Sequence, residues 1–271
     1  MEVLVPPSPS PSGTSTAPAA SGPPSDPPAL VLPGSPIQQV WAEAHPKPTL
    51  LSDFILGSQD GIVNVLGIIL GLVAAHTAAK IVLIAALAAL GAESIAMAAV
   101  AYTSTRSRRR LYLGEVQREL QEMRTVPHLE RKEVADVLQQ WGYEGAELSD
   151  LLDRICRNPR AWLDFMMAFE LKLRPVEGDE PRKSAYVVGA STIVGHLVPL
   201  TPFFFVGSDL LLGAALAVGL STVALFGTGW YEAKVSVGRW WQNGLQMVLI
   251  GLGGGVAGYA IGYAIQAAPW T

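Results

Sequence analysis

The chain is short of charge and almost without cysteine. Only 15% of its 271 residues are Asp, Glu, Lys or Arg, while 50% are hydrophobic. This balance excludes an ordinary soluble globular domain, in which about 25% of the residues are charged. The single Cys156 excludes an internal disulfide, so the sequence does not require an oxidising compartment.

Several functional signatures are also missing. No basic stripe interleaved with aromatic residues occurs, which argues against nucleic acid as a partner. No Ser-His-Asp spacing, phosphate-binding loop or cysteine-based metal motif is evident. We therefore expect neither an enzyme nor a protein with a prosthetic group.

Residues 1–38 lack the apolar content needed for folding. They are rich in proline, serine, alanine and glycine, and no basic segment followed by an apolar one marks a secretory signal peptide. Such a composition buries too little apolar surface to offset the entropy of ordering the chain. We expect a disordered tail here.

The rest of the chain is dominated by apolar segments of membrane length. Five of them approach the ~20 residues that a helix needs to cross a hydrocarbon core. The last contains Gly254, Gly258 and Gly262 at intervals of four, a spacing that permits close approach of two helices in lipid. The five segments cover residues 54–75, 80–103, 186–206, 209–230 and 244–267.

Most of the charged residues lie between the second and third segments. This polar block has helical periodicity, and Pro127 and the stretch "QQWGYEG" divide it into about three helices. Asn158 and Pro159 suit the N-cap and first position of the last helix. We predict an all-α membrane protein with five transmembrane helices and a cytoplasmic three-helix metal-binding domain inserted between the second and third. The predicted regions are the tail 1–38, two spans in 39–104, the cytoplasmic domain 105–183, and three spans in 184–271.

The positive charges predict the orientation. Five spans place the N-terminus, the polar block and the connection 231–243 on one side of the membrane. These segments hold 18 of the 19 Lys and Arg residues, and Lys80 is the exception. By the positive-inside rule that side is the cytoplasm. We expect a multi-pass membrane protein whose N-terminus and polar block, residues 105–183, are cytoplasmic.

Two acids lie inside apolar segments, where a lipid-facing carboxylate costs roughly 2.5–3.5 kcal/mol. Asp60 is in the first segment and Glu93 in the second. Asp53 precedes Asp60 by two turns on one face, and Met97 follows Glu93 by one turn. Such a line of acids with a thioether suits a pathway for a transition-metal cation or a proton. The alternative is an acid bonded to a neighbouring helix, with Met97 as packing. His196, in the third segment, is a proton carrier or a hydrogen-bonded helix residue.

The polar block carries a second group of candidate ligands. Glutamates occur three residues apart on each side of Pro127, so each pair shares a helix face and the turn could bring the faces together. Two methionines and a fifth glutamate follow within one turn. Taken alone, the alternative is a solvated face, with Arg118, Arg131 and Lys132 as neighbours. Carboxylates with thioethers suit ions of the Fe²⁺ or Mn²⁺ type. The candidates are Glu119, Glu122, Glu130, Glu133, Met166, Met167 and Glu170.

In this order the residues resemble the vacuolar iron transporter family, which includes yeast and plant vacuolar iron/manganese transporters and prokaryotic relatives. The resemblance runs from about Leu51 to the last span. The segments that carry it are "SDFILGSQDGIVNVLGIILGLVAA", "ESIAMAAVAYTSTRS", "VGHLVPLTPFF" and "NGLQMVLIGLGGGVAGYAIGYAI", together with the Glu and Met pattern of the polar block.

The resemblance implies a homodimeric, proton-coupled exporter of cytoplasmic Fe²⁺, and often Mn²⁺ or other divalent ions, which are its substrates. It also implies that Asp60 and Met97 ligate metal in the membrane and that Asp53 lies along the route. The glutamates and methionines of the polar block would collect metal and feed it to the pore.

The chain departs from that pattern in the second span. Many relatives have Gly-Glu-Tyr after the methionine, where this chain has Val100-Ala101-Tyr102. Glu93 is a candidate substitute for the missing acid. Two alternatives without transport remain open, a membrane-anchored metal sensor and a di-iron carboxylate protein. The second commonly uses Glu-x-x-His pairs, and no glutamate in this sequence has a histidine three residues later.

Overall fold

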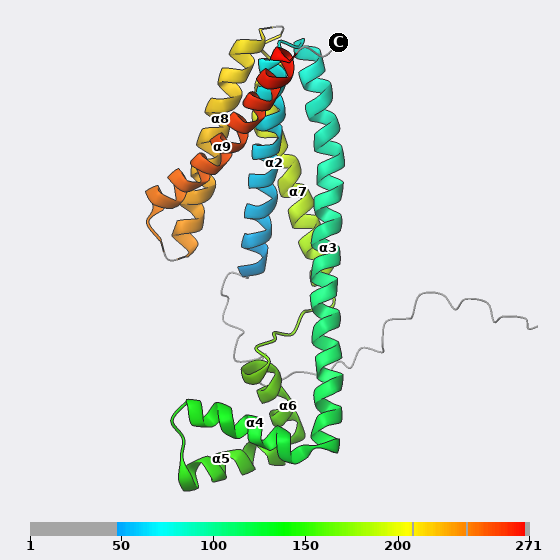
Figure 1. Ribbon diagram of the computed structural model, residues 1–271, viewed down its shortest axis with the longest axis vertical. Coiled ribbons are helices and arrows are strands. Elements are labelled where there is room, and N and C mark those ends of the chain that lie inside the picture. Colours follow the sequence, from blue (N-terminus) through cyan, green and yellow to red (C-terminus); the bar gives the residue numbers. More distant parts are fainter. Residues whose placement is uncertain (1–47, 208, 237, 269–271) are drawn as a thin grey trace, which may run out of the picture. The chain divides into compact units, whose positions relative to one another are not determined.

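The structure is a computed structural model that describes residues 48–207, 209–236 and 238–268. The tail predicted over residues 1–38 lies outside these ranges. Every element within them is helical (Figure 1). In chain order the elements are α2 (Pro48–Ala74), α3 (Ala79–Thr125), α4 (Pro127–Gln140), α5 (Gly145–Arg157), α6 (Pro159–Phe165), the π-helix η1 (Met166–Glu170), α7 (Glu180–Leu200), the 3₁₀-helix η2 (Thr201–Phe204), α8 (Leu210–Val235) and α9 (Trp240–Ala267).

Five helices are long and apolar enough to cross a membrane, namely α2, α3, α7 with η2, α8 and α9. The short helices α4, α5 and α6 lie between the second and third of them in the chain. Both observations confirm the predicted fold class, an all-helical chain with five spans and a helical insertion.

Helix α3 is one unbroken helix that passes residue 104, where we expected the membrane part to end. Its 47 residues correspond to about 70 Å, more than twice the thickness of a hydrocarbon core. Only the apolar first half, to about residue 103, can therefore lie within the bilayer. The charged second half, which includes Glu119 and Glu122, lies outside it.

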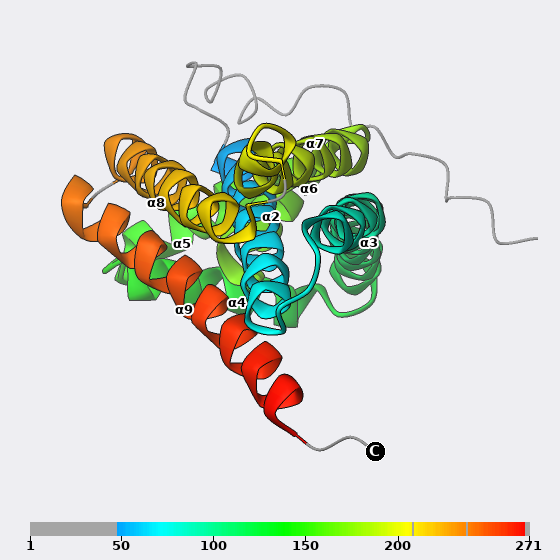
Figure 2. The same cartoon turned by 90° about the horizontal axis from the view of Figure 1, so that it is seen from above.

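Helix α2 packs against each of the other long helices, α3, α7, α8 and α9. Viewed from above, it lies among them (Figure 2). Val65, Leu66 and Ile69 of α2 are fully buried in the largest apolar cluster. Since α2 also carries Asp53 and Asp60, these two acids lie on a helix that contacts every other span.

Glycines allow the closest approaches to α2. A Cβ added at Gly258 of α9 would lie 2.2 Å from the carbonyl oxygen of Gly67, and one at Gly262 would lie 2.0 Å from that of Gly71. Real Cβ atoms do not come so close to backbone atoms, so the two helices touch along their backbones. The close helix approach predicted from the glycine spacing is confirmed.

The short helices begin and end at recognisable signals. Pro127 occupies the first turn of α4 directly after α3 ends. The Asn158 side chain accepts hydrogen bonds from the backbone N–H groups of Arg160 and Ala161, which confirms it as the N-cap of α6 with Pro159 at the first position. A separate apolar cluster joins α4, α5, α6 and η1 through Val134, Leu138, Cys156, Trp162, Phe165 and Met166.

The α2–α9 contact gives a first prediction. Replacing Gly258 with leucine should lower the free energy of unfolding by about 1–3 kcal/mol, because the side chain has no space against Gly67. Thermal unfolding of the purified protein in detergent measures this loss. Gly253→Leu is the matched control, since a Cβ at Gly253 on the same helix meets nothing within 4 Å. Equal unfolding temperatures for the two variants would contradict the backbone contact.

Candidate metal site

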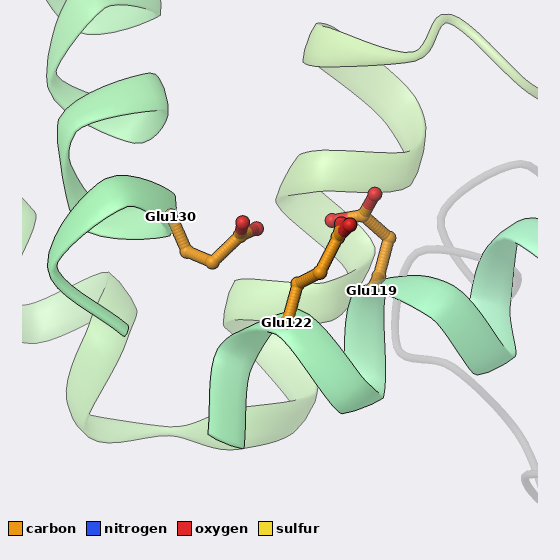
Figure 3. A group of neighbouring side chains, drawn as sticks. All are labelled: Glu119, Glu122 and Glu130. Carbon is orange, nitrogen blue, oxygen red and sulfur yellow. The ribbon is translucent and has the colours of Figure 1, made fainter. Parts of the chain in front are cut away.

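Three glutamates meet where α3 turns into α4. Glu119 and Glu122 lie one turn apart near the end of α3, and Glu130 lies in the first turn of α4. One carboxylate oxygen of each lies within 4.8 Å of one from each of the others. Glu130 reaches from its own helix toward the two side chains on α3 (Figure 3). The bend at Pro127 therefore brings Glu130 to the glutamate pair of α3, as the turn could do according to the sequence.

Two of these glutamates are buried. Glu119 and Glu130 are each 3% exposed, which excludes the solvated-face alternative for them. Within the described ranges, Oε2 of each is buried without a hydrogen-bond partner, and so is Oε2 of Glu170. A buried acceptor without a partner is unfavourable, and three such oxygens from neighbouring acids are typical of a site that a cation completes.

The electrostatics of the cluster follow from burial and crowding. Burial first, and then the neighbouring Glu130 and Glu170, raise the pKa of Glu119 to about 8. Burial and the charge of Glu133 raise the pKa of Glu130. Burial and Glu133 likewise raise the pKa of Glu170, against a smaller opposing effect of Arg118. The five glutamates predicted as ligands thus act on one another at a single place.

The nearby basic residues have partners outside the cluster. Arg118 forms an ion pair with Glu115, one turn earlier on α3. Arg131 forms an ion pair with Asp153 of α5. In the part of the chain that the structure describes, the acids of the cluster form no salt bridge.

The two methionines lie in η1, directly after α6. Met166 is fully buried against Val134 and Trp162, and Met167 is 3% exposed and packs with Val116 and Leu163. Their side chains thus contribute to the apolar clusters that hold η1 in place. The π-helical turn also carries Glu170, and such turns are frequent at functional sites. A role for the thioethers as ligands remains a prediction.

The membrane acids occupy facing helices. Asp60 is partly buried on α2, and its Oδ2 is enclosed without a hydrogen-bond partner among the described residues. The carboxylate of Glu93 on α3 lies close enough to interact electrostatically with that of Asp60. Asp53 and Met97 are partly exposed on the same two helices. The structure thus brings Asp60 and Glu93 together, while the roles of Asp53 and Met97 remain predictions.

Two further residues join this group. Asn64 of α2 donates a hydrogen bond to Oε1 of Glu93, and Nε2 of His196 on α7 lies 2.9 Å from its Oε2. His196 is therefore a hydrogen-bonded helix residue, and its role as a proton carrier remains a prediction, whereas Asn64 was missed. The signal for it is weak, since an asparagine one turn after Asp60 has many ordinary roles in a membrane helix.

Comparison with known proteins agrees with this arrangement. A family model described as "VIT family" matches residues 51–263, nearly the whole described chain. This chain belongs to the VIT family. It is 33% identical over 217 residues to "Vacuolar iron transporter 1" of Oryza sativa subsp. japonica, covering 80% of this chain and 86% of that protein. It is 29% identical over 217 residues to the protein of that name from Arabidopsis thaliana, with the same shares covered.

A more distant VIT-family relative is "Protein CCC1" of Saccharomyces cerevisiae, 27% identical over 227 residues that cover 81% of this chain and 69% of the yeast protein. Family membership confirms the resemblance seen in the sequence. It also confirms that the chain is a multi-pass membrane protein from a family of transporters and not of enzymes.

The raised pKa values predict how the stability of this VIT-family protein depends on pH. Because Glu119 titrates near 8 when folded and near 4.5 when unfolded, the folded state binds the proton more tightly. Its contribution to stability is present below pH 4.5 and is lost as the pH rises to about 8. We expect the unfolding temperature of the chelated protein in detergent to fall between pH 5 and pH 8.5.

Glu119→Gln should make this fall shallower. The control is Glu147→Gln, which changes an exposed glutamate of α5 outside the cluster and should leave the slope as it is. A parent protein whose stability rises with pH over this interval would contradict the proposed crowding of acids.

Proposed function

We propose that this VIT-family protein exports Fe²⁺, and Mn²⁺ or a related divalent transition metal, from the cytoplasm in exchange for protons. The observation that carries the proposal is the group of Glu119, Glu122 and Glu130, in which Glu119 and Glu130 are buried and have enclosed oxygens without a partner in the described ranges. Relatives named as vacuolar iron transporters over 80% of this chain support iron as the substrate.

The chemistry of the cluster suits this cargo. Carboxylate oxygens bind Fe²⁺ and Mn²⁺, and the buried thioethers of Met166 and Met167 border the same helices. In the proposed function these groups, with Glu133 and Glu170, collect the ion on the cytoplasmic side. The acids lie beyond the membrane half of α3, on the side where 18 of the 19 Lys and Arg residues also lie in our assignment.

In the proposed route the ion then passes along α2 and α3. Asp53 lies toward the cytoplasmic end of α2, and Asp60 lies two turns deeper with an enclosed, unpartnered oxygen. Met97 offers a softer donor on α3. A proton and a divalent cation compete for the Asp60 carboxylate, so protonation from the far side releases the ion. Exchange of one for the other follows from alternating access. We include a homodimer and the plasma (inner) or vacuolar membrane in this proposal.

Asp60 provides the direct test of the proposed transport. Protein reconstituted in vesicles with an imposed pH gradient should move Fe²⁺ and Mn²⁺, and Asp60→Asn and Asp60→Ala should abolish that flux because neither side chain holds a charge for the ion. Glu147→Gln serves as the control for purification and reconstitution. Metal flux through Asp60→Ala equal to that of the parent would refute the assigned role. Parent vesicles without flux would favour the sensor or di-iron alternative.

The cytoplasmic cluster makes a separate prediction. In the full-length protein, Glu119→Ala together with Glu122→Ala should weaken Mn²⁺ binding by about tenfold or more, corresponding to about 1.4 kcal/mol or more. Binding by the parent should strengthen from pH 6.5 to pH 8, because the ion must displace the proton that Glu119 holds with a pKa of about 8.

Calorimetric titration at the two pH values measures both effects on binding. Identical titration curves for the double variant and the parent would return the cluster to a structural role. Glu144→Ala together with Glu147→Ala at the start of α5 is the matched control, since it removes the same number of acids from an exposed surface of the same helical insertion.

A further inference from the structure

Glu93 is held at both of its carboxylate oxygens by helices other than its own. Asn64 of α2 donates to Oε1, and Nε2 of His196 on α7 lies 2.9 Å from Oε2. These contacts join α2, α3 and α7 at the level of Asp60. His196 is fully buried, and the Glu93 side chain is 19% exposed.

The hydrogen bond of Nδ1 of His196 determines the role of Nε2 in the contact with Glu93. Nδ1 lies 2.8 Å from the carbonyl oxygen of Thr192, one turn earlier on α7. A carbonyl oxygen can only accept, so Nδ1 must carry a hydrogen. The contact between Nε2 and Oε2 then contains one proton, on the imidazole or on the carboxyl group.

Asp60 differs from Glu93 in its hydrogen-bond partners. Its Oδ2 is buried and finds no donor in the described ranges, although its carboxylate interacts with that of Glu93 across the α2–α3 contact. Of these two neighbouring acids, Glu93 has a hydrogen-bond partner at each carboxylate oxygen, whereas Asp60 has one oxygen without a partner among the described residues.

Gly61, directly after Asp60, allows His196 to come this close. A Cβ at Gly61 would lie 2.5 Å from the carbonyl oxygen of Thr192 and 2.7 Å from Nδ1 of His196. The absence of a side chain there lets α2 lie directly against the histidine. The Asp-Gly pair of α2 thus supplies both the open acid and the space for the residue that holds Glu93.

We propose that His196 and Asn64 are positioning residues that hold Glu93 as a hydrogen-bonded link between three helices, so that Glu93 does not ligate the transported ion. This inference rests on the proposed transport function and alters one part of it, because the sequence placed Glu93 in the pathway. Asp60 is then the acid available to the ion at this depth. Two open carboxylates would bind a divalent ion more tightly and delay its release, whereas conduction requires binding weak enough for the ion to leave.

The variant Glu93→Gln distinguishes a positioning role of Glu93 from a role as a ligand of the ion. Its carbonyl oxygen can accept from Asn64, and its amide can donate to Nε2 of a neutral His196, so both hydrogen bonds survive without a carboxylate. In reconstituted vesicles Glu93→Gln should therefore keep the apparent KM for Mn²⁺ within about threefold of the parent value. A KM raised about tenfold or more, with a comparable loss of flux, would show that Glu93 ligates the ion and would overturn the proposal.

Replacement of the histidine tests the same link from α7. His196→Leu leaves the Glu93 carboxylate without its partner beside Asp60, and we expect a changed apparent KM as well as a lower maximal flux. Adding Glu93→Gln removes the unbalanced charge and should restore the KM toward the parent value. Merely additive effects of the two substitutions would contradict an action of His196 through Glu93.

Thermal unfolding in detergent tests the hydrogen bonds of Glu93 independently of transport. Glu93→Gln should unfold near the parent temperature, while Glu93→Ala, which loses both hydrogen bonds, should unfold at a lower one. Equal stability of the parent and Glu93→Ala would overturn the link even in the presence of metal flux. If the parent gave no flux but the two variants differed as expected, the transport function would fail and the link would stand.

Discussion

A carboxylate can be buried in a protein only where another group compensates its charge or a proton neutralises it. Both candidate sites in this protein depend on that requirement. In the membrane half, the carboxylate of Glu93 is hydrogen-bonded to a histidine and an asparagine from two other helices. Glu119 and Glu130 meet the requirement in the helical insertion by raised pKa values, which keep protons on crowded, buried acids. Asp60 and this cluster retain enclosed oxygens that have no partner among the residues that the structure describes. These oxygens are where a cation would be most favourable.

The packing of the long helices positions those acids. Glycines of α2 and α9 bring the two backbones into contact, and glycines of α2 allow α7 to lie against it with His196 facing Glu93. Because α2 packs against every other long helix, a displacement of α2 moves Asp60 relative to all of them. The unbroken α3 extends from the membrane acids to the cluster near Thr125. A single rigid element thus carries residues of both sites.

Much of this arrangement follows from local sequence. The five apolar segments predict the five spans because hydrocarbon thickness dictates helix length. Pro127 predicts the turn between α3 and α4, which allows Glu119, Glu122 and Glu130 to meet but does not exclude a solvated face for them. The continuation of α3 past residue 104 was not predicted, because a change from apolar to charged residues marks the membrane surface without interrupting helical backbone bonds.

What the sequence by itself determined is the class of the protein, its number of spans, and the residue types that recur at helical spacing in the VIT family. Only the tertiary structure decided which acids are buried and which partner each one has. Glu93 and His196 lie 103 residues apart in the chain, and no periodicity links positions on separate helices. Burial of Glu119 and Glu130 likewise depends on how α4 and η1 pack against α3. Charge compensation is a property of three-dimensional neighbours, so the roles of Asp60 and Glu93 differ although the sequence presents them alike.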